Sequence, residues 1–130
     1  MIHQTQFILY VSDQDKSKEF YQKILQLDPV LDVPGMTEFE LSVNTKLGLM
    51  PETSIAKIIE SNTTHPASGN GIPRCEVYLL VDRIQAYMDR SIQHGAKLVS
   101  PLTKRDWGHK VAYFADPDGH IIAFAEKIVH

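Results

Sequence analysis

Two polar side chains that open apolar strands are the residues of this chain whose type and position could do chemistry. Gln6 begins the stretch Gln-Phe-Ile-Leu-Tyr-Val, and Glu76 begins the similar stretch Glu-Val-Tyr-Leu-Leu-Val. Side chains alternate across a strand, so Glu76 shares its side with Tyr78. Burial beside an aromatic ring disfavours a charged carboxylate and lets it act as a general base, which is the catalytic role considered for Glu76. The alternative is an ion pair of Glu76 with Arg74 or Lys110.

The same alternation predicts which side chains would line a binding site around these two residues. Gln6 could hold a carbonyl or amide group of a ligand, since a few polar groups among apolar ones are typical of small-molecule sites. For the apolar candidates the alternative is ordinary core, which we expect for at least half of them. The candidate ligand-binding residues are Gln6, Ile8, Tyr10, Met50, Glu76, Tyr78, Trp107, His109, Val111 and Tyr113.

Trp107 and Arg105 precede the strand that carries His109. Together they could form the rim of the site and stack on, or pair with, a flat anionic ligand. For Arg105 we expect the alternative, which is a solvated charge in a loop.

The elements that must position these residues follow one another in an order that occurs twice. Asp13 is a good helix N-cap, and Phe20 and Ile24 belong to the apolar stripe of the helix that follows. In the second half, Asp82 is the expected cap and Gly95 the residue that ends the helix. The first half is predicted as strand 5–11, helix 14–26 and strands 30–33, 39–43 and 46–50; the second is predicted as strand 76–81, a helix up to residue 94 and strands 97–100, 110–115 and 121–126.

Residues 51–73 separate the two halves. Ile55, Ile58 and Ile59 indicate a short helix there, before a polar stretch that contains glycine. The simplest interpretation is a linker, and the alternative is a lid over a pocket, because long ordered loops are often functional. The sequence therefore predicts a single α+β domain over residues 1–130, built of two similar β-α-β-β-β modules at 1–50 and 74–130.

The composition argues against several classes of partner. The formal charge is -3 and no basic run exceeds the pair Lys104-Arg105, which argues against nucleic acid. No apolar run approaches the roughly 20 residues of a membrane-spanning helix. The single cysteine, Cys75, has no partner for an internal disulfide, which fits a cytoplasmic protein.

The motifs of both halves resemble those of the glyoxalase / bleomycin-resistance / extradiol dioxygenase superfamily, also called the vicinal oxygen chelate superfamily. The first half carries Val-Ser-Asp at 11–13, then Phe20-Tyr21; the second carries Val-Ala-Tyr-Phe-Ala-Asp-Pro-Asp-Gly-His at 111–120. The resemblance implies two βαβββ modules whose curved sheets form an open barrel around a ligand cleft, and it implies a homodimer.

Many members of this superfamily hold a divalent metal with four side chains, two from each module. The corresponding positions are Gln6, Gly48, Glu76 and Ala123, and two of these four residues have no donor atom. Glu126 cannot substitute, because alternation should turn it away from the cleft. A catalytic site generally needs three protein ligands plus water. We therefore expect no tightly bound metal and no other cofactor, with a weak divalent ion as the alternative.

Three functions remain open at this point. The first, which we expect, is a metal-independent protein that binds a small molecule, as bleomycin-resistance proteins do. The second is a metal-dependent lyase or isomerase similar to lactoylglutathione lyase. The third is a metal-free enzyme with Glu76 as its general base.

Overall fold

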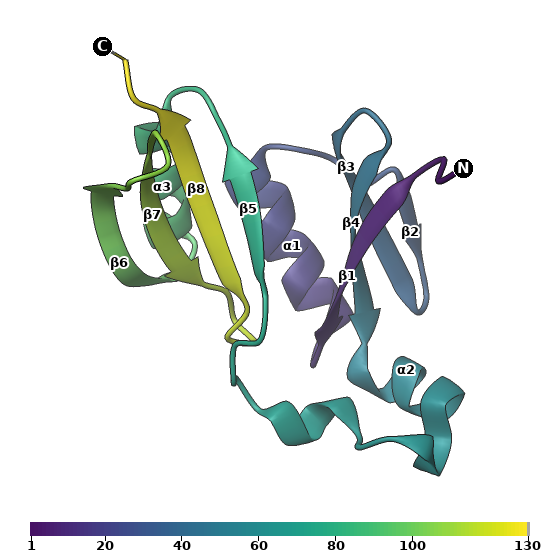
Figure 1. The fold of residues 1–130 in the computed structure, drawn as a ribbon. Helices are drawn as coiled ribbons and strands as arrows, with labels where there is room; N and C mark the ends of the chain where they lie inside the picture. Colours follow the sequence, from purple (N-terminus) through teal and green to yellow (C-terminus); the bar gives the residue numbers. More distant parts are fainter. Residues whose placement is uncertain (130) are drawn as a thin grey trace. The chain divides into compact units, whose positions relative to one another are not determined.

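The protein consists of two compact units of similar construction (Figure 1). The computed structural model describes residues 1–129. The chain divides between Asn70 and Gly71, and each resulting unit holds one four-stranded sheet with the strand-helix-strand-strand-strand order. This confirms the predicted α+β class with two βαβββ modules. The prediction that residues 1–130 form a single domain stays a prediction.

The first unit comprises residues 1–70. Its sheet has the order β1-β4-β3-β2, in which β1 runs parallel to β4 and the other neighbours are antiparallel. Its elements are β1 (Thr5–Val11), α1 (Gln14–Leu25), β2 (Leu31–Val33), β3 (Met36–Ser42), β4 (Thr45–Pro51), α2 (Glu52–Ile59), η1 (Glu60–Asn62) and η2 (Pro66–Gly69).

Helix α1 covers one side of the first sheet. Asp13 caps the helix as predicted, because its carboxylate accepts a hydrogen bond from the backbone N–H of Lys16 at 3.0 Å. The amide of Gln14 donates to Oγ1 of the buried Thr37 at 2.9 Å, which places Thr37 on the helix side of β3. Alternation then puts Glu38 on the opposite side. We call the side of a sheet that its helix does not cover the open face.

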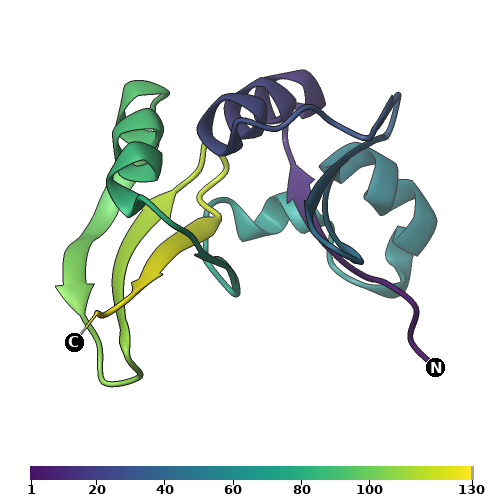
Figure 2. The same cartoon turned by 90° about the horizontal axis from the view of Figure 1, so that it is seen from above.

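The second unit repeats this arrangement from residue 71 onward. Its sheet has the order β5-β8-β7-β6, and Figure 2 shows α3 against one side of it. The ring of Tyr87 lies 5.2 Å from that of Phe124, so Phe124 faces the helix and Ala123 and Ala125 belong to the open face. Its elements are β5 (Glu76–Leu80), α3 (Ile84–Gln93), β6 (Lys97–Lys104), β7 (His109–Ala115) and β8 (Ile121–Lys127).

The start of α3 differs from the prediction. Asp82 is not the cap: the N-cap residue is Arg83, in a left-handed conformation with φ 56°, and its side chain makes no cap bond. The carboxylate of Glu126, on the neighbouring β8, instead accepts from the backbone N–H of Ile84 at 3.3 Å. The acceptor at the start of α3 is thus Glu126, distant in the sequence, rather than the predicted Asp82. Glu126 faces away from the open face, as predicted.

Two strands extend at least three residues beyond a predicted end. β6 continues through Pro101 to Lys104, although the prediction ended at Ser100. Since β6 lies at the edge of its sheet, the missing N–H of Pro101 interrupts no ladder on the outer side. β3 begins at Met36 rather than at Phe39.

The hairpin between β7 and β8 is held by Asp116. Its Oδ1 accepts from the backbone N–H groups of Asp118 and His120 at 2.9 and 2.8 Å. Gly119 has φ 87°, and a Cβ there would lie 2.8 Å from Cα of Gly71, so the turn requires glycine. This turn sets the register that pairs Tyr113 with Ala123.

The segment predicted as a linker contains helix α2, as its isoleucines indicated. α2 contacts β1 and β4 and therefore belongs to the first unit. Its possible role as a lid stays a prediction. Across residues 1–129 no helix has the length and apolar character needed to cross a bilayer.

Candidate functional site

On the open face of the first unit, a polar bridge crosses the middle strand above a glycine. Gly48 on β4 pairs with Ile8 on β1 and with Glu38 on β3. The Gln6 amide donates to Oε2 of Glu38 at 2.8 Å, so this bond spans β4. A Cβ at position 48 would lie only 2.7 Å from Nε2 of Gln6 and 3.2 Å from Sδ of Met36. The absence of a side chain at Gly48 is what allows the bridge.

Glu38 is the centre of this bridge, and no pattern in the sequence singled it out. Its side chain is 15% exposed, and its Oε1 lies 3.5 Å from Nζ of Lys46. The amide of Gln6 and the ammonium of Lys46 therefore already serve both carboxylate oxygens. Gln6, Glu38 and Lys46 thus pair with one another on the first open face.

On the open face of the second unit, three side chains form a hydrogen-bonded chain. Nε1 of Trp107 donates to the hydroxyl oxygen of Tyr78 at 3.0 Å, and that oxygen lies 2.6 Å from Nδ1 of His109. If the hydroxyl donates to Nδ1, the neutral imidazole carries its proton on Nε2; if Nδ1 donates, the hydroxyl proton is free. In either case one donor remains for a ligand.

Small residues form the floor beneath this chain. Tyr78 and His109 stand on β5 and β7, which lie on either side of β8, so their bond spans β8. Ala123 and Ala125 of β8 are fully buried and cluster with the buried Val111. Tyr78 and Trp107 themselves are exposed, the latter by 56%. The result is an aromatic surface with polar tips over a closed aliphatic floor.

Arg105 lies on the same face beside Tyr113. Its guanidinium carbon is 5.6 Å from the centre of the Tyr113 ring, and one Nη2–H donates to Oγ of Ser100 at 3.3 Å. Nε of Arg105 is buried and has no hydrogen-bond partner among the described residues. The prediction of a solvated loop charge is therefore wrong, because the side chain folds back over the sheet.

The predicted lining residues divide into two groups, one on each unit. Ile8 and Tyr10 are exposed and Met50 half-buried on the first unit, while Val111 is closed core. On the second unit, Tyr78 is hydrogen-bonded to both Trp107 and His109. Val111 and Tyr113 belong to the adjoining apolar cluster. The ligand contacts of all ten stay predictions.

Glu76 stands apart from these groups. It is exposed at the start of β5, so the described residues do not supply the burial on which its role as a base would depend. The alternative ion pair with Lys110 is wrong, because Lys110 pairs with Glu126 at 3.1 Å. Among the residues that the structure describes, Arg74 does not pair with Glu76 either.

The donor sets do not fit a divalent metal. In the first unit, Gly48 offers no donor, and the Lys46 ammonium beside Glu38 repels a cation. In the second unit, Ala123 offers no donor and is covered. Within residues 1–129 no three His, Cys, Asp or Glu side chains group in a way that could hold a metal ion.

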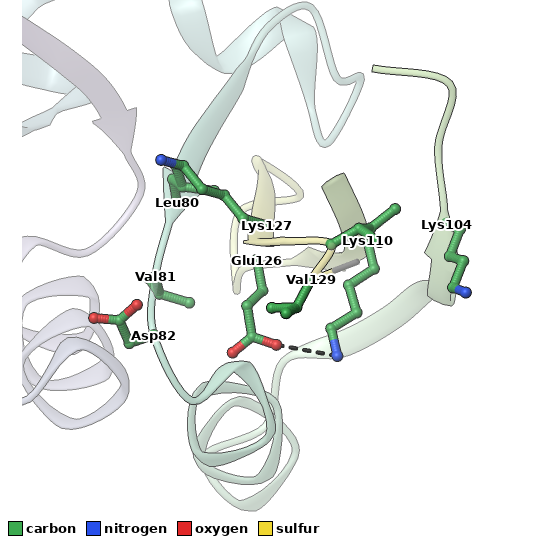
Figure 3. Close-up of a pocket in the computed structure, with 9 residues that line it drawn as sticks. Leu80, Val81, Asp82, Lys104, Lys110, Glu126, Lys127 and Val129 are labelled. Carbon is green, nitrogen blue, oxygen red and sulfur yellow. Dashed lines mark ion pairs between the residues drawn. The ribbon is translucent and has the colours of Figure 1, made fainter. Parts of the chain in front are cut away.

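A separate hollow of about 700 Å³ lies at another part of the second unit (Figure 3). Its charged groups do not converge: Lys110 pairs with Glu126, while Lys104 and Lys127 stand at opposite sides of the view. Hydrogen bonds to the carboxylate hold the pKa of Glu126 below its ordinary value; the bond from Lys110 has the larger effect and the bond from the backbone N–H of Ile84 the smaller one. This ion pair has a structural role at the start of α3, so the hollow is not the candidate site.

The paired βαβββ units, each with a small residue at the middle of its open face, define a protein of the glyoxalase-like class. Residues 4–129 match the Glyoxalase-like domain family, and the chain belongs to that family. It is 28% identical over 120 residues to the uncharacterized protein YraH of Bacillus subtilis, covering 90% of this chain and 92% of YraH.

Solved structures share the fold. A glyoxalase-related enzyme from Fulvimarina pelagi superimposes with a TM-score of 0.79 at 21% identity, covering 95% of this chain and 86% of that one. A glyoxalase / bleomycin resistance protein / dioxygenase from Nocardioides gives a TM-score of 0.74 at 22% identity, covering 95% and 82%. These likenesses show the same fold, and the family match over residues 4–129 agrees with the superfamily that the motifs indicated.

Proposed function

We propose that the protein binds a small organic ligand on the open face of its second unit and does so without a resident metal. The single observation that carries this proposal is the chain from Trp107 through Tyr78 to His109 over a floor of alanines. Aromatic side chains together with a few polar groups are the usual lining of a small-molecule site.

Each residue has a definite part in this proposal. The exposed indole of Trp107 offers a flat surface for an aromatic or conjugated ligand. Tyr78 and His109 together present one donor to a polar group of that ligand. Ala123 and Ala125 keep the floor shallow, because a longer side chain on β8 would occupy the space over which the rings lie.

The test uses Trp107 as its reporter, since it is the only tryptophan of the chain. A library of aromatic and conjugated compounds is screened for quenching of Trp107 fluorescence and for a rise in melting temperature. We expect saturable hits that Tyr78→Ala weakens at least about tenfold and that Tyr87→Phe, on the helix side of the same sheet, leaves unchanged. Hits that are equally tight in the Tyr78→Ala variant would contradict the proposed site.

The metal-independent part of the proposal has its own measurement. Protein purified without chelator is analysed for bound metals, and ligand binding is compared before and after treatment with EDTA. We expect a substoichiometric metal content and unchanged affinity. A stoichiometric metal that is lost in Glu76→Ala would instead favour a metal-dependent lyase or isomerase.

We also propose that the protein is a homodimer in the cytoplasm. β1 is an edge strand that carries the exposed apolar side chains Phe7, Ile8 and Tyr10. An exposed apolar edge favours pairing, and two-fold dimers are the commonest oligomers. The exposed, unpaired Cys75 fits a reducing compartment.

A further inference from the structure

Arg105 is the cation that lies against the ring of Tyr113 on the open face of the second unit, and its hydrogen-bonding capacity is largely unused. A guanidinium carries five N–H donors and stays charged at any physiological pH. The described residues take up one of these donors, through the 3.3 Å bond to Ser100. Nε is buried with no acceptor, and no carboxylate among residues 1–129 forms an ion pair with the side chain.

This arrangement is costly for an arginine that has only a structural role. Buried donors are paired in the great majority of native structures, and leaving one unpaired costs free energy. A charged side chain makes the loss larger, because charge-assisted hydrogen bonds are about twice as strong as neutral ones. The guanidinium is held only by a long hydrogen bond to Ser100 and by the ring of Tyr113. Turning toward an external acceptor would therefore cost little interaction energy.

We infer that Arg105 selects the ligand by its charge, and that the ligand carries a carboxylate attached to a flat aromatic body. This inference rests on the proposed function and narrows it. The planar guanidinium matches a carboxylate through two parallel N–H bonds. Trp107 and the Tyr113 ring, on the same face, offer the surfaces on which the aromatic body lies.

The surrounding charges favour a monoanion. Lys104 precedes Arg105 directly, and Lys127 has the same orientation on β8 as Ala125. Both lysines line the separate hollow rather than the cluster of Arg105, Ser100 and Tyr113. Lys110 is committed to Glu126. A phosphate or diphosphate, which recruits several cations or a backbone cradle, would find a single guanidinium here. One positive charge beside two rings fits one carboxylate beside one ring.

The test compares two probes that differ in charge and hardly in shape, benzoate and benzamide. Titration is followed by the ¹⁵N–¹H signal of the Arg105 side-chain Nε, assigned by its disappearance in Arg105→Gln. We expect benzoate to shift this signal saturably and to bind at least about tenfold more tightly than benzamide. Arg105→Gln should abolish the preference for benzoate. Arg105→Lys keeps the positive charge but lacks the two parallel N–H donors of a guanidinium, so it should retain part of the preference.

The control is Arg74→Gln, which removes an exposed arginine of the same unit and should leave the preference for benzoate intact. The inference is overturned if benzoate leaves the Arg105 signal in place, if benzamide binds as tightly as benzoate, or if Arg105→Gln retains the preference. A circular dichroism melt shows whether each variant is folded. Should Arg105→Gln not fold, Arg105→Lys and the Nε signal of the wild type still decide. Neutral hits from the library screen that depend on Tyr78 would in all these cases leave the proposed function standing.

Discussion

The two open faces have the same plan and opposite chemistry. In each unit the middle strand carries a residue too small to hold a ligand of its own, Gly48 in the first and Ala123 in the second. In each, side chains from the two flanking strands meet across that strand. The first unit joins Gln6 to Glu38, and the second joins Tyr78 to His109.

The difference lies in what remains after these bonds are made. Glu38 accepts from an amide and lies beside an ammonium, so both of its carboxylate oxygens have a partner within the first unit. The second face keeps a spare donor on the Tyr78–His109 pair and a guanidinium with an unpaired Nε. Two sheets of the same topology thus differ in their networks: the first network stabilises its own sheet, and the second is the one for which we propose ligand binding.

The edges of the two sheets provide the prediction with the largest expected effect. Phe7 on β1 and Val77 on β5 occupy corresponding positions, but Phe7 is 53% exposed and Val77 only 7%. If a second copy covers β1, Phe7→Lys removes an apolar contact twice in a symmetric dimer. A loss of about 2 kcal/mol per copy weakens dimerisation about a thousandfold. Sedimentation equilibrium measures this effect directly.

The matched control for Phe7→Lys is Val43→Lys. Val43 is 82% exposed in the turn between β3 and β4, away from the strand edge. We expect this variant to dimerise like the wild type. A wild-type chain that is monomeric at all concentrations would refute the proposed interface.

The second prediction breaks the bridge of the first face by filling the space above Gly48. A leucine there must displace Gln6, and it also meets Ile8, whose Cγ1 would lie 3.1 Å from the new Cβ. Overpacking of this kind costs about 1–3 kcal/mol. Urea unfolding should show a lower midpoint with an unchanged slope. Gly69→Leu is the control, because a Cβ at Gly69 has no atom within 4 Å; equal losses in both variants would show that the bridge is unimportant.

The third prediction compares two ion pairs through their pH dependence. Lys110 lowers the pKa of Glu126 in the second unit, and Lys18 lowers that of Asp32 in the first. A carboxylate with a lowered folded-state pKa adds stability above its unfolded value, and this contribution is lost as the pH falls through the folded one. For Glu126 the loss begins below the ordinary value of 4.5. Glu126→Gln and Asp32→Asn should each flatten the fall of melting temperature between pH 5 and pH 3. A variant whose pH profile is unaltered would contradict the role of its ion pair.

Most of the fold was predictable because its signals are local. The strand at 5–11, the cap at Asp13 and the short helix marked by Ile55 follow from alternation, side-chain capping and helical spacing. The failures have non-local causes. The cap of α3 comes from Glu126, 42 residues away, and β6 tolerates Pro101 because it is an edge strand.

For the candidate site, the alternation of side chains along a strand predicted which residues share a face, and nothing more. Alternation placed His109, Val111 and Tyr113 on one face, and the bond from His109 to Tyr78 agrees with it. Glu38 was missed because its importance depends on the register of β3 against Gly48, which the sequence does not state. Arg105 was misjudged because its position in a hairpin says nothing about which way its long side chain folds.

The last prediction has the smallest effect and separates the two faces most sharply. Tyr78→Phe removes one hydroxyl, which accepts from Trp107 and contacts His109. Because these groups are partly in water, the stability loss should stay near 1 kcal/mol or less. The indole of Trp107, released from its acceptor, should show longer-wavelength emission and lower anisotropy. Tyr113→Phe makes the same chemical change on the same face, where no hydrogen bond of the Tyr113 hydroxyl to the described residues is lost, and should leave the emission unchanged. If both variants shift the emission alike, the tryptophan responds to the ring surface as a whole, and the chain from Trp107 to His109 does not order the second face.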